Sequence, residues 1–265
     1  MDVACSTLCF TREPLVQALR MIAELEFTKV DLAVGDGNPH VSTEAVVSSP
    51  AAVLNELKLG PTLAVSAITL RTARTGEPLE ECIDAAAHLC KLVSAPVLTI
   101  EAAPSGTPID QEVARLRRVV GVAAVHGVTA AVATRTGALT ETPTAAAELC
   151  ERVDGLKLTL DPSHFLCGPN QGRCFDEVYP YVEHVHLRDS ARRMDQFQVT
   201  VGRGEIEYGK IINSLCRFGY RGVLTVALED QLATGGFNAF VESRKLRLLL
   251  ESYLVQRDSA LFRAA

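Results

Sequence analysis

The chain has 265 residues, of which 48% are hydrophobic, and its formal net charge is −6. Such a chain can bury a large core, and its acidic balance argues against a general nucleic-acid binder, which normally carries a basic excess. The first residues lack the basic start and the long apolar run of a signal peptide, and no stretch is apolar for long enough to span a bilayer. We therefore expect a cytoplasmic protein without a nucleic-acid or membrane partner.

The first half of the chain alternates short apolar runs with helical patterns. Strands are predicted over residues 3–10, 29–34, 62–70 and 96–101, which are rich in Val, Ile, Leu and Ala. A helix follows Pro14, a favourable first-turn residue, and a short helix is predicted over residues 50–58. The clearest helix precedes the fourth strand, because its apolar residues recur at the spacing of one helical face: Leu79, Cys82, Ile83, Ala86, Leu89 and Val93.

The second half continues the same alternation. A helix carrying Val113, Leu116, Val120 and Ala123 leads into a strand, and Gly219 is placed to end a later helix. Strands are predicted over residues 128–134, 156–161, 184–188 and 222–228, and helices over residues 143–152, 175–181, 211–218 and 237–254.

Eight strand–helix units are the number that a closed barrel of parallel strands needs. We therefore predict an α/β fold, a (β/α)8 TIM barrel, with residues 1–265 forming a single domain. The competing architecture is a doubly wound open sheet. That fold usually has fewer units at this length, and no GxGxxG motif follows the first strand.

The eight cysteines are scattered along the chain, and none forms a CxxC pair. Several lie beside Ala and Leu in helical patterns, where cysteine behaves as a small apolar residue. In a long chain without a signal peptide, reduced thiols are favoured over disulfides or a zinc site. We expect reduced thiols at Cys5, Cys9, Cys82, Cys90, Cys150, Cys167, Cys174 and Cys216.

Polar residues gather at the predicted strand ends, where barrel active sites lie. Asp161 ends the sixth strand with His164 three residues on, so a carboxylate and an imidazole are able to enter one pocket. Turn capping by Asp161 and a surface His164 are the alternative. The other polar strand-end residues are Asp31, Glu101, Arg135, His186, Arg188 and Glu229.

The seventh strand places His184, His186 and Arg188 on one parity, so all three side chains are expected to point into the barrel. His184 is the deepest of them and is interpreted as a hydrogen-bonded core histidine. Arg188 either binds a ligand or forms an ion pair with Asp161 or Glu229. A Gly-x-Gly turn at residues 201–204 then offers backbone N–H groups to an anion, although an ordinary turn is the simpler interpretation.

Three segments carry a family resemblance: LKLTLDPSHF, VEHVHLRDS and VGRGEIEYGKIINSLCRFGYRGVLTVALED, within residues 156–230. In order and spacing they resemble the second half of the sugar-phosphate isomerase/epimerase barrels, the xylose isomerase-like TIM barrel or AP endonuclease 2 superfamily. That superfamily includes ketose 3-epimerases, inosose dehydratases, hydroxypyruvate isomerases and endonuclease IV-type nucleases. The first half of the chain matches mainly in its strand–helix rhythm.

The resemblance implies a divalent metal held by a Glu ending strand five, an Asp ending strand six, a His on strand seven and a Glu on strand eight. Asp161 and His186 match their positions, and His164 matches the substrate-site histidine of the family. Ala133 and Ala227 stand where the two glutamates are expected. Because Mg²⁺ and Mn²⁺ need several oxygen ligands, we expect a Mn, Mg or Zn site that is weakened or absent.

These residues predict an isomerase or epimerase-like protein for a small, anionic polyhydroxy carbonyl compound. The base would be His164, Glu229 or Glu101, and Arg188 or a metal at Asp161 and His186 would be the electrophile. The arginines expected to bind the anionic substrate are Arg71, Arg135, Arg188 and Arg203.

Two alternatives stay open on the same barrel: a lyase or dehydratase, and a non-catalytic ligand-binding protein. A nuclease is disfavoured, because the chain has only six histidines for a multi-metal cluster. Barrels of this kind often form dimers or tetramers, and no feature of the sequence selects between them.

Overall fold

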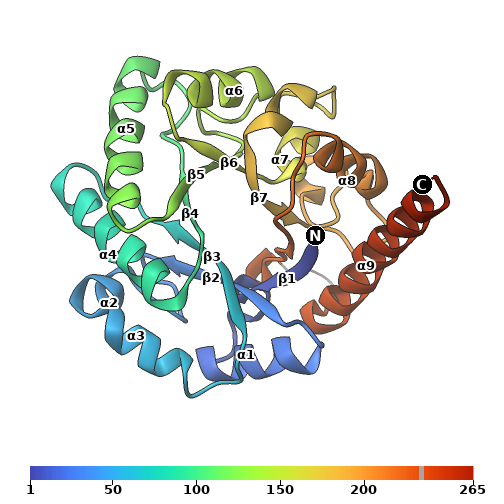
Figure 1. Ribbon diagram of the computed structural model, residues 1–265, viewed down its shortest axis with the longest axis horizontal. Coiled ribbons are helices and arrows are strands. Elements are labelled where there is room, and N and C mark those ends of the chain that lie inside the picture. The colour runs from blue at the N-terminus through green and yellow to red at the C-terminus, as the bar shows by residue number, and fades with distance from the viewer. Residues whose placement is uncertain (233–235, 265) are drawn as a thin grey trace.

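The computed structural model describes residues 1–232 and 236–264, the segment 257–264 by its backbone alone. The strands form one closed barrel in chain order, and every neighbouring pair is parallel, including β1 with β8 (Figure 1). The strands are β1 Asp2–Ser6, β2 Lys29–Gly35, β3 Ala64–Arg71, β4 Val97–Glu101, β5 Thr129–Ala133, β6 Lys157–Leu160, β7 Val182–Leu187 and β8 Val223–Val226. The predicted (β/α)8 TIM barrel is confirmed.

Helices surround the barrel on all sides in Figure 1. They are α1 Leu15–Glu24, α2 Thr43–Ser48, α3 Pro50–Leu57, α4 Glu77–Val93, α5 Ile109–Val125, α6 Pro143–Arg152, α7 Pro162–Cys167, α8 Tyr208–Arg217 and α9 Ala239–Ala264. Short 3₁₀ helices, η1 Thr7–Phe10, η2 Asp176–Tyr181, η3 Met194–Gln196 and η4 Asp230–Leu232, lie in the connections.

The apolar faces predicted from helical spacing pack against the barrel. In α4, Leu79, Ile83 and Leu89 are buried, as the spacing required. Each such side chain contributes about 1.5–3 kcal/mol through burial. Gly219 follows α8 with a φ of +80°, the left-handed conformation that commonly ends a helix.

Two predicted elements are wrong in type. Residues 7–10 were expected to continue the first strand, but they form η1, because the Ser6 side chain accepts a hydrogen bond from the Leu8 N–H and turns the chain. Residues 175–181 were expected to be an α-helix, but residues from Asp176 onward form η2, which contains Pro180 and so lacks one backbone donor. The regular helix of this unit is instead the short α7, directly after β6.

The thiol prediction agrees with the structure. Free thiols are buried at Cys5, Cys9, Cys82, Cys90, Cys150 and Cys167. Over residues 1–232 and 236–264, no helix is both long and apolar enough to cross a membrane.

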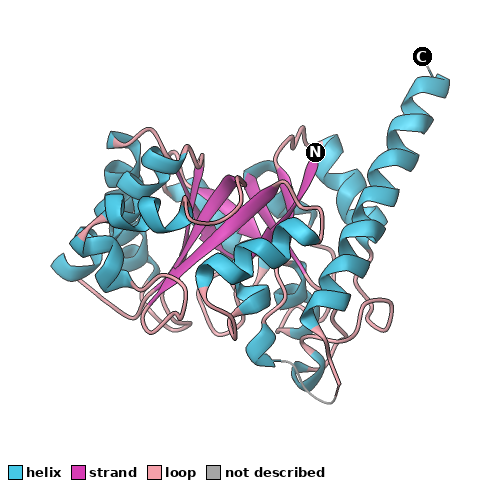
Figure 2. Ribbon diagram, turned by 90° about the horizontal axis from the view of Figure 1, so that it is seen from below, coloured by secondary structure: helices cyan, strands magenta, loops and turns pink. Residues whose placement is uncertain are grey.

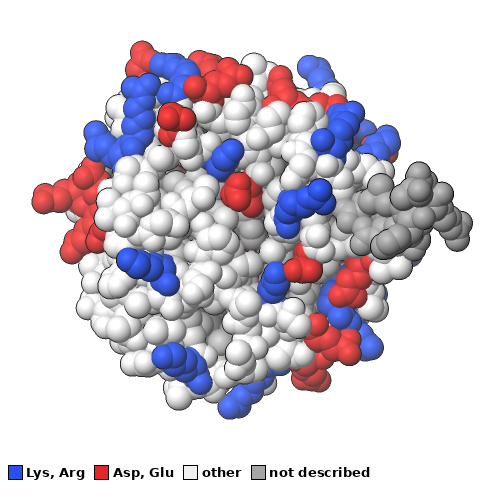
Figure 3. Space-filling view, viewed as in Figure 1, with Lys and Arg blue, Asp and Glu red and all other residues white. Residues whose placement is uncertain are grey.

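The two ends of the barrel differ in character. Figure 2 places the N-terminus at the upper end, where the strands begin. Figure 3 views that end, where both acidic and basic side chains lie near the centre as well as around the edge. A concentrated charged network lies at the opposite end, where the strands finish.

Candidate functional site

Arg188, which directly follows β7, lies at the centre of the charged network. Only 1% of its side chain is exposed, its Nη2 lies 3.0 Å from Asp161 Oδ2, and its Nη1 lies 3.2 Å from Glu229 Oε1. Both carboxylates that the sequence offered as partners therefore hold the same guanidinium. Every second residue of an extended chain points to the same face, so the Arg188 side chain points into the barrel together with those of His184 and His186.

The network continues outward over the ends of β3, β4 and β5. Arg71 Nη2 donates to Glu229 Oε1 at 3.1 Å, and Arg71 Nε lies 3.9 Å from Glu101 Oε1. Arg135 donates to the same Glu101 carboxylate. Three guanidinium groups thus alternate with three carboxylates, so the set is neutral overall. We call it the rim network: Arg71, Glu101, Arg135, Asp161, Arg188 and Glu229.

The inner carboxylates of the rim network stay ionised at neutral pH. Burial acts to raise the pKa of Glu229, but Arg188 and Arg71 outweigh it and lower the pKa to about 2. Burial also acts against ionisation of Asp161, and the charge of Arg188 is the main cause that lowers its pKa instead. The same two carboxylates raise the pKa of Arg188 against its burial. A carboxylate with so low a pKa is a weak general base.

His164 lies beside the rim network in α7. Its Nδ1 accepts a hydrogen bond from the Thr136 N–H at 3.2 Å, and its Nε2 lies 3.9 Å from Asp161 Oδ2. Burial is the largest cause that lowers the pKa of His164, to about 4. The imidazole is therefore neutral at pH 7, and because Nδ1 accepts, the proton is carried by Nε2. His164 is arranged to donate a hydrogen bond from Nε2.

Phe197 covers both groups from the connection between β7 and α8. Its ring centroid lies 4.7 Å from that of His164, and the guanidinium carbon of Arg188 lies 4.8 Å from the same ring. An aromatic face beside a guanidinium adds a cation–π attraction. Phe197 thus separates Arg188 and His164 from solvent.

A second charged group, which we call the inner cluster, lies deeper in the barrel: Asp31, Thr69, His184 and His186. Asp31 is completely buried, and its carboxylate accepts from Thr69 Oγ1 at 3.0 Å, from His184 Nε2 at 3.0 Å and from His186 Nε2 at 2.5 Å. Burial acts to raise the pKa of Asp31, but the two histidines outweigh it and lower the pKa. The interpretation of His184 as a hydrogen-bonded core histidine agrees with these contacts.

Within the described residues, Asp31, His184 and His186 are also the one group of three metal-ligating side chains whose ligand atoms lie within 4.8 Å of one another. Two ligands of one zinc ion are normally about 3 Å apart or more, given metal–ligand distances of about 2.0–2.1 Å. The separation of 2.5 Å between His186 Nε2 and Asp31 Oδ2 is that of a hydrogen bond. The inner cluster is therefore arranged as a hydrogen-bonded group.

The residues at the implied metal position do not fit a divalent ion. Ala133 and Ala227 offer no ligand atom, and Asp161 already holds Arg188 at 3.0 Å. His186 donates its Nε2 proton to Asp31, although it lines the same cavity as Asp161. A guanidinium close to the single remaining carboxylate opposes a second positive charge.

The backbone N–H groups of the Gly-x-Gly turn donate to a carboxylate of the same chain, that of Asp189. The Gly202 and Gly204 N–H groups donate to Asp189 Oδ2 at 2.7 Å and 3.0 Å. Gly204 is required here, because a Cβ at this position would lie 2.1 Å from Asp189 Oδ1. Arg203, expected to bind substrate, is exposed on this turn and does not line the cavity at the barrel mouth.

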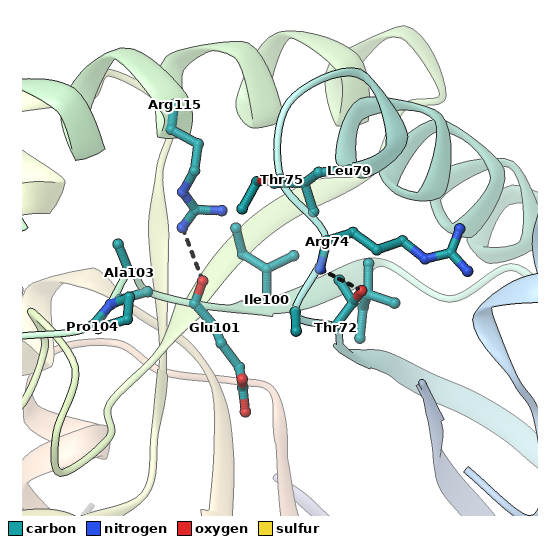
Figure 4. Close-up of a pocket in the computed structure, with 12 residues that line it drawn as sticks. Thr72, Arg74, Thr75, Leu79, Ile100, Glu101, Ala103, Pro104 and Arg115 are labelled. Carbon is teal, nitrogen blue, oxygen red and sulfur yellow. Dashed lines mark hydrogen bonds between the residues drawn. The ribbon is translucent and has the colours of Figure 1, made fainter. Parts of the chain in front are cut away.

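Two cavities meet at Glu101. The one at the barrel mouth has a volume of only about 20 Å³, little more than a single water molecule occupies, and is lined by Glu101, Ala133, Arg135, Asp161, His164 and His186 among others. The other, of about 390 Å³, lies between the β3–α4 and β4–α5 connections. Figure 4 shows this larger cavity: the Glu101 backbone carbonyl accepts from Arg115 there, while the Glu101 carboxylate points the other way.

The structure thus brings most of the predicted residues together. His164, Glu101, Glu229, Arg71, Arg135, Arg188, Asp161 and His186 share one end of the barrel, and Arg203 does not join them. The sequence offered Asp31 as a strand-end residue without its histidine partners, and it gave no signal for Phe197.

Comparisons with known proteins agree with the barrel fold. A family model described as a xylose isomerase-like TIM barrel matches residues 61–246. No curated protein matches the chain in sequence.

Solved structures share the fold at low sequence identity. An L-ribulose 3-epimerase is 15% identical with a TM-score of 0.73, covering 100% of this chain and 99% of that chain. A xylose isomerase-like TIM barrel protein from Mycobacterium smegmatis, in complex with magnesium, is 17% identical with a TM-score of 0.72, covering 96% and 97%. A probable 3-DHS dehydratase, AsbF from Bacillus anthracis, is 17% identical with a TM-score of 0.69, covering 95% and 99%.

The family match spans most of the barrel, and the solved structures show the same closed fold over nearly their whole length. The chain belongs to the xylose isomerase-like TIM barrel family.

Proposed function

We propose that the protein isomerises or epimerises a small polyhydroxy carbonyl compound that carries an anionic group. Such a reaction removes a proton beside a carbonyl and returns it at another position, and it needs a base and a donor to the enediolate oxygen. The observation that carries the proposal is the convergence of Glu101, His164, Arg71 and Arg135 at one small cavity, whose Asp161 is paired with the buried Arg188. Sugar epimerases that share the fold support this reaction class.

Glu101 is the group we propose as the base. Its carboxylate lines the mouth cavity and is 28% exposed, so a substrate is able to reach it. Glu229 is less suited, because its pKa of about 2 makes it a poor proton acceptor. His164, with its proton on Nε2, is the proposed donor to the substrate oxygen, because a neutral imidazole polarises a carbonyl through such a bond.

The anionic group is proposed to enter by exchange of ion-pair partners. Glu101 is bound to Arg135 and lies 3.9 Å from Arg71. A phosphate or carboxylate of the substrate offers these guanidinium groups an equivalent fork of oxygens. Its binding would release Glu101 to accept a proton and would open the cavity, which at about 20 Å³ is too small for a sugar. The requirement for an anion follows from this exchange.

Metal is not part of the proposed reaction. Alanine stands at positions 133 and 227, where a Mn, Mg or Zn ion would gain two carboxylate ligands, and Asp161 holds Arg188 instead. One protein that shares the fold, from Mycobacterium smegmatis, is in complex with magnesium. In this chain the positive charge at the site comes from arginine.

Proton exchange in deuterated water tests the proposal. Ketose phosphates and keto-sugar acids would be incubated with the protein, and loss of the proton beside the carbonyl would be followed by ¹H NMR. Glu101→Gln should slow exchange by about 10²–10⁴-fold, because general base catalysis is worth that much. Glu80→Gln, an exposed pair with Arg118 on α4, is the matched control and should leave exchange unchanged.

Three results would contradict the proposal. Exchange that persists in Glu101→Gln removes Glu101 as the base. Faster exchange with uncharged ketoses than with their phosphates removes the anion requirement. Exchange accompanied by loss of water would assign the protein to the dehydratase class, to which the fold relative AsbF is ascribed.

A further inference from the structure

Arg188 fills the place between two carboxylates at the end of the barrel. Its Nη2 and Nη1 lie 3.0 Å from Asp161 and 3.2 Å from Glu229, and its side chain is 1% exposed. Asp161 is the carboxylate that the family resemblance assigns to a divalent ion. A fully buried guanidinium at hydrogen-bond distance from it leaves no room for an ion at the same oxygen.

The electrostatics favour the resident guanidinium over an incoming ion. The Arg188 charge already lies between the two carboxylates, 3.0 Å from Asp161 Oδ2 and 3.2 Å from Glu229 Oε1, and compensates them. Removal of one partner from such a buried pair is strongly destabilising, because the other charges are left uncompensated. A divalent ion would have to displace this paired cation and would find only alanine at positions 133 and 227.

We infer that the Arg188 guanidinium is the resident cation of this barrel and excludes a divalent ion from the place between Asp161 and Glu229. The guanidinium takes the place of a metal ion in charge and in position. Asp161 and Glu229 remain as its partners, and alanine stands at the two further ligand positions, 133 and 227.

One donor of the guanidinium is left without a partner. Arg188 Nε is buried and makes no hydrogen bond, although the Nη1 and Nη2 atoms are both paired. A buried donor without a hydrogen-bond partner is costly, so this N–H is open to a ligand or a water molecule.

A Mn²⁺ titration without substrate tests the inference. Free Mn²⁺ would be followed by electron paramagnetic resonance in wild type, Asp161→Asn, Arg188→Ala, Arg188→Lys, and Arg188→Ala combined with Asp161→Asn. Wild type and Arg188→Lys should bind no Mn²⁺ that depends on Asp161. Arg188→Ala should bind about one Mn²⁺ per chain, with an affinity at least tenfold above any residual binding by wild type, and the double variant should lose this binding.

Two results overturn the inference. The first is stoichiometric Mn²⁺ binding by wild type that Asp161→Asn abolishes. The second is an Arg188→Ala protein that folds, as shown by circular dichroism, and binds no more Mn²⁺ than wild type. If Arg188→Ala does not fold, Arg188→Gln replaces it, and a rise in its unfolding temperature with Mn²⁺ supports the inference while no rise contradicts it.

The titration and the proposed reaction fail independently. Because no substrate is present, Mn²⁺ binding reports only on the ion site. Absence of proton exchange in the NMR experiment would remove the proposed function and leave the resident cation intact. Mn²⁺ binding by wild type would remove the resident cation and leave Glu101 as the base.

Discussion

The inner cluster and the rim network both contain charged side chains inside the barrel or at its mouth. They differ in how completely the polar atoms of those side chains are hydrogen-bonded. In the inner cluster, Asp31 is fully buried and accepts hydrogen bonds from Thr69, His184 and His186. In the rim network, the Glu101 side chain is 28% exposed, the Arg135 side chain is 43% exposed, and Arg188 Nε has no partner. Groups that already have their partners hold a fold together, whereas groups that lack one are available to a ligand.

Depth alone does not explain the difference. Arg188 is as buried as the inner cluster, yet one of its donors is unpaired. Asp189 directly follows Arg188 of the rim network in sequence, yet its carboxylate accepts hydrogen bonds from the backbone N–H groups of Gly202 and Gly204. The contrast is therefore between completed and incomplete hydrogen bonding, and it predicts which substitutions affect stability and which affect binding.

The largest effect is expected at Asp31. Asp31→Ala removes the shared acceptor of two buried imidazoles and a threonine, so it should lower the free energy of unfolding by about 3–5 kcal/mol. Urea denaturation followed by circular dichroism measures this change. Asp2→Ala, at a 63% exposed side chain paired with Lys29, is the control and should cost less than about 1 kcal/mol. Equal losses in the two variants would show that the inner cluster has no special structural role.

Glu229 should give the rim network an acid-sensitive contribution. Its folded pKa lies at about 2, below its ordinary 4.5, so the stabilisation is complete above pH 4.5 and is lost as the pH falls towards 2. Glu229→Gln should therefore be roughly 3 kcal/mol less stable than wild type at pH 6, and the gap should narrow below pH 4.5. Urea denaturation of both proteins at pH 6, 4 and 3 measures the gap.

A constant gap at all three pH values would contradict the ionised pairing of Glu229. Glu205→Gln is the matched control, because Glu205 forms an exposed pair with Arg192 on the neighbouring loop. That variant should stay within about 1 kcal/mol of wild type throughout.

Local periodicity allowed the rim network to be predicted in large part. The alternation of strand seven placed His186 and Arg188 on one face, and the barrel architecture then brought Asp161 and Glu229 to the same end. Both predictions depend on the two-residue repeat of a strand and on the order of the strands in the barrel, and both can be inferred from a single sequence. The absence of carboxylates at Ala133 and Ala227 was visible for the same reason.

The inner cluster was not predicted, because its contacts cross the barrel. Asp31 on β2 and His184 on β7 are 153 residues apart, and no local pattern encodes which interior side chains meet. The helix α7 was missed despite a usable signal. Asp161 precedes Pro162, and the Asp161 side chain accepts from the Ser163 N–H, the arrangement of an N-cap followed by a first-turn proline.

Gly204 provides a smaller and more local test of completed bonding. Gly204→Ala would place a methyl group 2.1 Å from Asp189 Oδ1 and 2.6 Å from the Ser190 carbonyl oxygen, so the turn must open. We expect a loss of about 1–3 kcal/mol in unfolding free energy, measured by thermal and urea denaturation. Gly121→Ala, in the interior of α5 with no neighbour within 4 Å, should instead stabilise by about 0.5–1 kcal/mol. A neutral Gly204→Ala would mean that Asp189 is not tied to the turn.

The smallest stability effect is expected at the outermost pair, Arg135 with Glu101. A double-mutant cycle with Arg135→Gln and Glu101→Gln should give a coupling of only about 0.2–1 kcal/mol, because both side chains are partly exposed and water competes for them. The coupling should fall further in 1 M salt, where the Debye length is about 3 Å. A coupling above about 2 kcal/mol would place this pair with the inner cluster, as a fixed structural contact. A weak coupling is what partner exchange with an anionic substrate requires, since a strongly held Glu101 would be released only by an anion that binds Arg135 more tightly still.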